Sequence, residues 1–125
     1  MSLGASEIGR LEWATRAGRT HVEIPVDLHG AEGPVPGVTR NISVDGAFVA
    51  TSQLLPVGAR LLVMLVFPDE ARPLAVRAEV RWSRPATSNP NDGRPVGMGL
   101  RFLDPPLGVS LSIGELLESE RARQP

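Results

Sequence analysis

The chain has 125 residues, of which 42 % are hydrophobic and 22 % are charged. This size and composition predict a single folded domain and argue against a disordered or fibrous protein. A formal net charge of −1 disfavours sequence-independent binding to DNA or RNA, which requires a positive surface field. The lack of cysteine excludes a disulfide framework, a thiolate nucleophile and a Cys-based zinc site, and it fits a reducing compartment.

The lengths of the apolar runs in the sequence are used to predict where in the cell the protein is located. Residues 1–10 contain no run of signal-peptide length, and the longest apolar stretch, 61–67, is far too short to span a bilayer. We therefore expect a cytoplasmic protein that does not insert into membranes. Residues 1–15 are expected to form a flexible N-terminal arm, and residues 16–125 a single domain.

The first strand is predicted from alternation over residues 21–29. Val22, Ile24, Val26 and Leu28 are apolar and alternate with mostly polar residues, as expected for a strand with one buried face. Residues 30–37 then collect three glycines and two prolines, which predicts a loop or a wide hairpin. The extended pattern resumes over 38–43.

Three more strands are predicted along the chain. Residues 46–51 follow a turn, residues 59–67 form the most apolar stretch, and residues 74–82 alternate again, with Trp82 on the apolar face. Residues 84–95 are rich in Pro, Asn, Asp, Ser and Gly and predict a surface loop, after which 96–103 return to an extended pattern.

The last segment changes period. Leu111, Gly114, Leu116 and Leu117 are apolar or small at helical spacing, while the residues around them are mostly charged, so a short helix is expected over about 107–123. This helix could pack across an open end of the fold or dock a partner. About six short strands separated by Gly and Pro turns predict an all-β fold, either a sandwich or a small antiparallel barrel.

The segment 41–46 contains the pattern Asn41-x-Ser43-x-x-Gly46. Asn41 and Ser43 are two residues apart and should project from the same side of a strand, where both could hydrogen-bond one ligand. The same spacing is also typical of turn chemistry. Arg40, beside the motif, is expected to point to the opposite face from Asn41.

This stretch resembles the second motif of the PilZ family, Asp or Asn, x, Ser, x, x, Gly. The surroundings are similar as well, because a Pro-x-Gly step at 56–58, a Val-x-Trp ending at Trp82 and a Gly-x-Gly-x-x-Phe at 97–102 follow in the family's order. The resemblance covers about residues 16–103. It implies a six-stranded antiparallel β-barrel with a short C-terminal helix that binds cyclic di-GMP.

The first motif of the family is Arg-x-x-x-Arg, and here the sequence departs from it. Arg19 matches the second Arg, but the first position falls on Thr15, and Arg16 lies one residue late. The resemblance implies ligand contacts from Arg16, Arg19, Asn41, Ser43 and Gly46. Arg suits this ligand because its guanidinium can bind guanine edges, pair with phosphates and stack on flat rings.

Two functions remain open. The first is a cyclic di-GMP receptor that couples the nucleotide to a protein partner in motility, surface or polysaccharide regulation. The second is an interaction adaptor that has lost nucleotide binding, a possibility supported by the displaced first Arg.

The sequence shows no pattern typical of an enzyme active site, a metal site or a cofactor site. The two His residues, His21 and His29, lie about 27 Å apart on an extended strand, too far to share a metal ion. Gly97 and Gly99 are expected to ease barrel curvature, and Trp82 to be a core or rim residue.

Overall fold

The computed structural model describes residues 21–31, 33–85 and 96–123. The predicted arm, the predicted loop over 86–95, and the candidate ligands Arg16 and Arg19 lie outside these ranges. The described residues form six strands and a helix, β1 Pro25–Gly30, β2 Gly33–Ser43, β3 Gly46–Ala50, β4 Arg60–Leu65, β5 Leu74–Arg84, β6 Gly97–Leu103 and α2 Leu107–Arg123.

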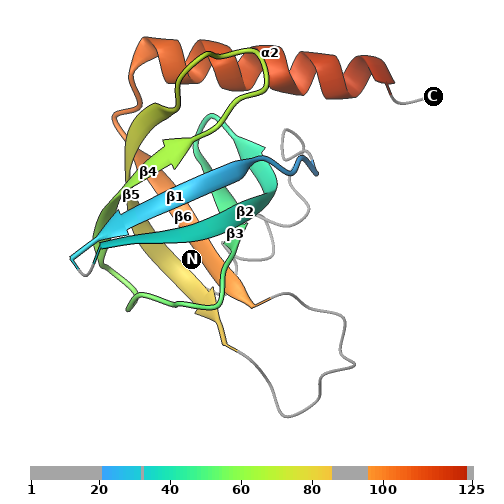
Figure 1. The fold of residues 1–125 in the computed structure, drawn as a ribbon. Helices are drawn as coiled ribbons and strands as arrows, with labels where there is room; N and C mark the ends of the chain where they lie inside the picture. The colour runs from blue at the N-terminus through green and yellow to red at the C-terminus, as the bar shows by residue number, and fades with distance from the viewer. Residues whose placement is uncertain (1–20, 32, 86–95, 124–125) are drawn as a thin grey trace, which may run out of the picture.

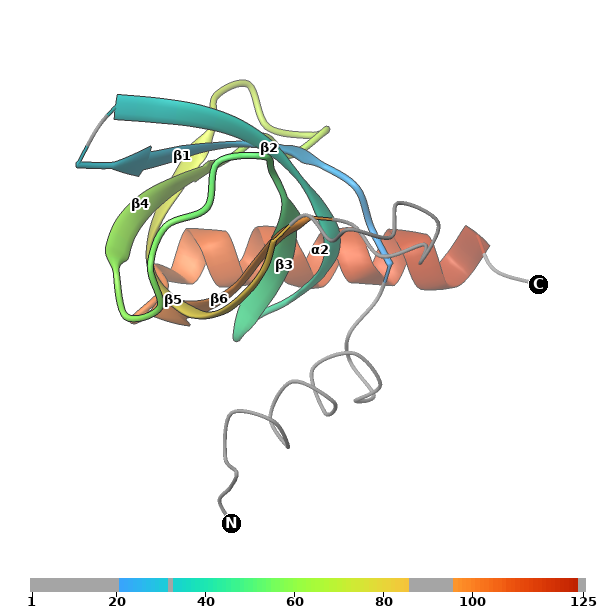
Figure 2. The ribbon, with the colours of Figure 1, turned by 90° about the horizontal axis from the view of Figure 1, so that it is seen from below.

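The strands close into an antiparallel barrel in the order β1-β2-β3-β6-β5-β4, and β4 pairs again with β1 (Figures 1 and 2). The predicted six-stranded barrel with a C-terminal helix is confirmed. Alternation explains the result, because outside two irregular positions in β2 and β5 every second residue of a strand points inward and fills the interior with aliphatic side chains. The most deeply buried include Leu28, Ile42, Val63, Leu65, Val76, Val80, Met98 and Leu100.

Residues 30–37, expected to form a loop or a wide hairpin, connect β1 and β2 as a hairpin, but most of them belong to strand β2 itself. Gly30 pairs with Gly33, and β2 begins there and runs through both prolines, with Pro36 opposite Asp27 on β1. The Pro36 carbonyl accepts a hydrogen bond from the Thr51 hydroxyl at 3.1 Å, so this residue's main-chain groups face away from β1. Proline is tolerated because its missing N–H is not needed for the β1–β2 ladder.

Helix α2 lies across one end of the barrel (Figure 1). Its buried side chains Val109, Ile113, Leu116 and Leu117 join the core, and it contacts β2 and β5. Of the two roles expected for this segment, packing across the end of the barrel is therefore observed. Within the described ranges, no helix has the length and apolar character needed to cross a membrane.

Candidate functional site

A β-bulge interrupts the pairing of β2 with β3 and sets the orientation of the motif. Thr39 pairs with Val49 and Asn41 pairs with Phe48, so Arg40 is the extra residue. Thr39 and Ile42 are completely buried, whereas Arg40 and Asn41 between them are partly exposed. The expectation that these two point to opposite faces is wrong, because a bulge places two consecutive residues opposite one. Both point out of the barrel.

A second bulge lies between β5 and β6 and changes the face of Trp82. Val80 pairs with Leu100 and Trp82 pairs with Gly99, so Arg81 is the extra residue. Val80 is completely buried inside the barrel, while Trp82 leaves the interior face. The alternation over residues 74–82 predicted Trp82 beside Val80, and this is wrong because periodicity does not reveal the extra residue.

The two bulges bring four residues into one row across the outside of the barrel. Asn41 on β2 pairs with Phe48 on β3, Phe48 with Gly99 on β6, and Gly99 with Trp82 on β5. The next row towards α2 runs from Ser43 through Gly46 and Arg101 to Glu79. We call this surface, formed by the outward residues of β2, β3, β6 and β5, the bulged wall.

The polar side chains of the motif hold the β2–β3 hairpin. Asn41 Oδ1 accepts a hydrogen bond from the Phe48 amide at 3.3 Å, and Ser43 Oγ accepts one from the Asp45 amide at 3.1 Å. The turn chemistry expected from the spacing is therefore present. Both bonds use acceptor oxygens, which leaves the Asn41 amide N–H groups and the Ser43 hydroxyl proton as the donors of the motif.

Two glycines of β6 make room for aromatic rings on this wall. A Cβ at Gly99 would overlap the indole nitrogen of Trp82, and a Cβ at Gly97 would lie 2.7 Å from Cζ of Phe48 and would overlap the Val49 carbonyl oxygen. Barrel curvature was the expected reason for these glycines. The close approach of two rings and of a neighbouring strand is the reason that the structure gives.

Arginines surround the motif on the same wall. Arg40 lies beside Asn41, with its Nε 3.7 Å from Glu23 Oε2, and Arg101 pairs with Gly46 from the adjacent strand. Arg81 lies 3.7 Å from the carboxylate of Glu79. These contacts are on the surface, where ion pairs contribute little to stability. The wall therefore carries several guanidinium groups at its surface.

The start of the described chain is fixed next to the motif. The completely buried Thr39 hydroxyl donates to the Val22 carbonyl at 2.6 Å and accepts from the Ile24 amide at 2.9 Å, and the Thr39 amide donates to the Ile24 carbonyl at 3.0 Å. Residues 21–24 thus run along β2. The described chain therefore begins at the edge of the bulged wall.

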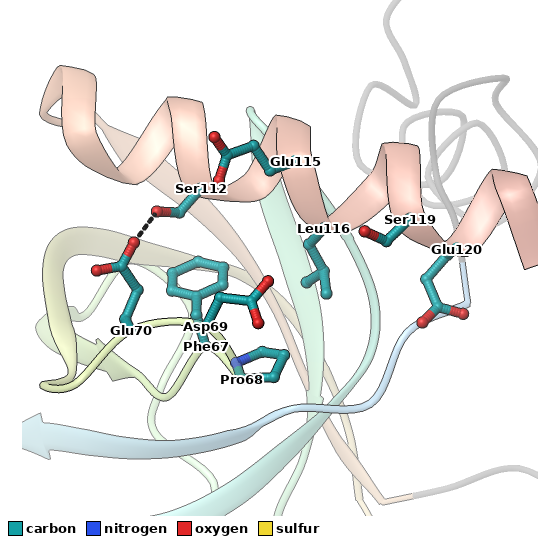
Figure 3. A pocket seen from close by; sticks show the side chains of 9 residues that line it. All are labelled: Phe67, Pro68, Asp69, Glu70, Ser112, Glu115, Leu116, Ser119 and Glu120. Carbon is teal, nitrogen blue, oxygen red and sulfur yellow. Dashed lines mark hydrogen bonds between the residues drawn. The ribbon is translucent and has the colours of Figure 1, made fainter.

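A separate pocket of about 110 Å³ lies under α2, at the end of the barrel (Figure 3). Phe67, Pro68 and Leu116 form its apolar part, and the carboxylates around it include Glu70. Ser112 Oγ donates a hydrogen bond to Glu70 Oε2 at 2.9 Å, which ties the helix to the β4–β5 turn. The pocket is built around a structural contact.

Within the part of the chain that the structure describes, no group of three or more His, Asp or Glu side chains is placed to hold a metal ion. His21 Nε2 lies 3.5 Å from Glu23 Oε2 on an exposed surface, in agreement with the solvated strand face expected from the sequence.

The barrel, its helix and the position of the motif at the β2–β3 turn are those of a known domain. A family model described as the PilZ domain matches residues 15–119. The chain belongs to the PilZ family. PilZ domains are regulatory binding domains of a cyclic di-GMP effector family, and no enzyme family is indicated.

Two solved structures share the PilZ fold with this chain. The Bacillus subtilis inhibitor of motility MotI/DgrA matches with a TM-score of 0.71 at 17 % identity, over 88 % of this chain and 52 % of its own. The PilZ domain of CeSA from a cellulose-synthesizing bacterium matches with a TM-score of 0.56 at 22 % identity, over 82 % of this chain and 97 % of its own. The chain thus spans about half of the motility inhibitor. No curated protein matches it.

Of the five site residues expected from the PilZ resemblance, the structure brings Asn41, Ser43 and Gly46 together on the bulged wall. Sequence reasoning did not assign Phe48, Trp82, Arg84 or Arg101 to this site. The available signal was the pairing of Val-x-Trp with Gly-x-Gly, since glycines on one strand can make room for a large side chain on the next.

Proposed function

We propose that this protein is a cyclic di-GMP receptor and that the nucleotide binds on the bulged wall. The main support for the proposal is that residues 21–24, at the start of the described chain, are hydrogen-bonded to β2 next to the motif. Thr39 holds Val22 and Ile24 directly beside Arg40 and Asn41. The described chain thus starts beside the second motif, and Arg19 precedes its first residue, His21, by two positions in the sequence.

Chain length supports a role for Arg19 in this site. It lies three positions before Val22, so the covalent chain keeps their Cα atoms within about 11 Å of each other. A long guanidinium side chain can cover the remaining distance to a ligand beside Asn41. Arg16 lies three residues further and would reach the ligand from the same segment.

The chemistry of the wall fits a cyclic dinucleotide. The ligand carries two phosphates and two guanine edges with O6 and N7 acceptors, which charged and amide donors can bind. Asn41 and Ser43 supply neutral donors, and Arg16, Arg19 and Arg101 supply cations. Gly46 lets the main chain lie close beneath the ligand.

We further propose that binding fixes the segment with Arg16 and Arg19 against the barrel and so changes the surface that a protein partner meets. This is a shift in conformational population, driven by the difference in ligand affinity between the two arrangements. The names of the two structural relatives, an inhibitor of motility and a domain of CeSA from a cellulose-synthesizing bacterium, support motility or polysaccharide production as the regulated process.

Calorimetric titration with cyclic di-GMP tests the receptor. The wild-type protein is compared with Arg19→Ala and with the double variant Asn41→Ala and Ser43→Ala. Loss of a charged hydrogen-bonding partner should weaken binding by about 1.5–3 kcal/mol, or about 10- to 150-fold. Arg72→Ala, an exposed arginine in the β4–β5 turn, is the matched control and should bind as the wild type does.

One observation favours the alternative function, an interaction adaptor without nucleotide binding. Asn41 and Ser43 already stabilise the hairpin through their own hydrogen bonds, so the motif would persist for structural reasons alone. Absence of heat and of thermal stabilisation at high ligand concentration would support the adaptor and refute the receptor.

A further inference from the structure

The side of α2 that faces away from the barrel carries two exposed leucines. Leu107 is 73 % exposed and Leu111 is 57 % exposed, while other apolar side chains of the same helix join the core. In Figure 1 the barrel lies on one side of α2 only. A surface helix normally has apolar residues on the side that packs against the core and polar residues on the opposite side. Apolar residues on both sides of α2 therefore indicate a second contact besides the one with the barrel.

The outward residues of α2 follow the spacing of a coiled coil. Successive steps of four, three and four residues join Leu107, Leu111, Gly114 and Glu118, and all four residues are exposed. We call this set the outer stripe. Steps that alternate between three and four keep residues on one line along a helix, where they can pack against the same line on a second helix. The first half of the outer stripe is apolar, whereas the second half is small and acidic.

Gly114 leaves room in the outer stripe for a large side chain. A Cβ built on this glycine would have no heavy atom within 4 Å, so the main chain of the helix is open to a neighbouring molecule there. Glycine inside a helix lowers its stability relative to most other residues. The helix therefore gains nothing from Gly114 itself, whereas a leucine on a second helix could pack over it.

We propose that two copies of the chain associate through the outer stripes of their α2 helices, which pack antiparallel about a two-fold axis. An axis between residues 112 and 113 places Leu111 over Gly114 of the partner subunit. The same axis places Leu107 beside Glu118 of the partner subunit. Each pair then occurs twice, as a two-fold interface requires, so the two unlike halves of the outer stripe complement each other.

The charges along the helix support the antiparallel arrangement. The first turn of α2 contains no acidic residue, so no side chain of that turn balances the positive end of the helix dipole. The proposed register brings Glu118 of the partner subunit to this turn, and it brings Arg121 of the partner subunit towards Asp104. The Asp104 side chain is 92 % exposed although it lies 3.7 Å from Arg77. A parallel arrangement would instead place the two Glu118 carboxylates together, where they repel each other.

The proposed contact is small, because each copy contributes a single helix. Interfaces below the standard size are usually weak, so the dimer should form only at high micromolar concentrations. Helix α2 lies across one end of the barrel (Figure 1), and the bulged wall stays outside the contact. The dimer is therefore independent of the proposed nucleotide site, and the two proposals stand or fall separately.

Sedimentation equilibrium between about 5 µM and 1 mM tests the association. The mass of the wild type should rise from 13.4 kDa towards twice that value. Leu111→Gln should weaken association at least about tenfold. Gly114→Gln should weaken it as much by filling the space for the leucine, although its higher helix propensity should raise the melting temperature of the monomer.

Two control variants should associate as the wild type does. Gly108→Gln changes a second exposed glycine of α2 with equally open surroundings, but at the edge of the outer stripe, where long polar side chains are tolerated. Leu62→Ser removes a partly exposed leucine from β4, outside the proposed contact. Thermal melting of each variant checks folding.

Introduced cysteines test the register, since the chain has none of its own. A mixture of Leu107→Cys and Glu118→Cys should form a disulfide-linked dimer more readily than either variant alone. The antiparallel register places these two positions opposite each other, whereas equal positions lie about 16 Å apart along the helices, too far for a disulfide. A wild type that stays monomeric at about 1 mM, undiminished association of Leu111→Gln and Gly114→Gln, or cross-linking of each cysteine variant with itself would overturn the proposal.

Discussion

Two sides of the barrel differ in how regularly their strands pair. On the regular wall, formed by the outward residues of β1 and β4, the strands pair one for one from Val26 with Leu65 to His29 with Leu62. On the bulged wall an extra residue enters β2 and another enters β5. No bulge interrupts the pairing of β1 with β4, whereas on the other wall the bulges re-aim side chains outward where a ligand is proposed to bind.

The largest expected effect concerns a glycine of the bulged wall, compared with a glycine at the end of β1. Gly97→Ala should destabilise the protein by about 3 kcal/mol, because the new Cβ would overlap the Val49 carbonyl of the neighbouring strand. Gly30→Ala, at the end of β1, would place its Cβ 3.3 Å from a mobile Leu55 methyl group and should change stability by no more than about 1 kcal/mol.

Urea denaturation measures both variants. Equal stability of Gly97→Ala and the wild type would show that β3 and β6 can separate without cost, which would contradict the tight packing of the bulged wall.

Next in size is the contact that fixes residues 21–24 to the bulged wall. Thr39→Val keeps the shape of the side chain but leaves the Ile24 amide and the Val22 carbonyl without their hydroxyl partner. We expect a loss of about 2 kcal/mol and faster hydrogen exchange at the Ile24 amide. Thr39→Ser keeps the hydroxyl and should retain slow exchange, and comparable exchange in both variants would disprove the role of this group.

A smaller effect is expected at the end of the barrel, where the β4–β5 turn meets the helix. Ser112→Ala removes the hydrogen bond to Glu70 and should lower the free energy of unfolding by about 1 kcal/mol, because the exposed carboxylate can be hydrated instead. Ser119→Ala, on the exposed surface of the same helix, is the control. Chemical denaturation of the two variants should separate them, and identical midpoints would contradict a stabilising bond.

The smallest effect is predicted for the regular wall itself. Leu62 is 37 % exposed on β4, so Leu62→Ser should change stability by no more than about 0.5 kcal/mol. It should also leave the affinity for cyclic di-GMP unchanged in the titration proposed above. A clear loss of affinity in this folded variant would show that the ligand binds on the regular wall and would contradict the proposed site.

Much of this architecture could be predicted from the sequence, because alternation reports the burial of a regular strand directly. β3 to β6 and the terminal helix begin and end within about two residues of their predicted ranges, whereas β1 begins at Pro25 and not at residue 21. Each wrong prediction has a single physical cause. Trp82 and Arg40 were assigned to the wrong faces because a single extra residue reverses alternation beyond it.

The start of β2 was missed because Gly and Pro normally interrupt strands, whereas here the prolines need no donor towards β1. Within the candidate site, Asn41, Ser43 and Gly46 were accessible as a contiguous motif. Phe48, Trp82 and Arg84 were not, since they meet only through pairing across three strands. The roles of Arg16 and Arg19 stay predictions.

Closure of the barrel has a consequence for how such a protein diversifies. Each strand has a neighbour on both sides, so the main-chain ladder is completed within the ring and a binding partner must recognise side chains instead of adding a strand. Exposed outward positions, unlike the closely packed Gly97 and Gly99, can then be substituted with little effect on the ring. A scaffold of this kind can acquire new specificities by surface substitution, in keeping with a shared fold at 17 % identity.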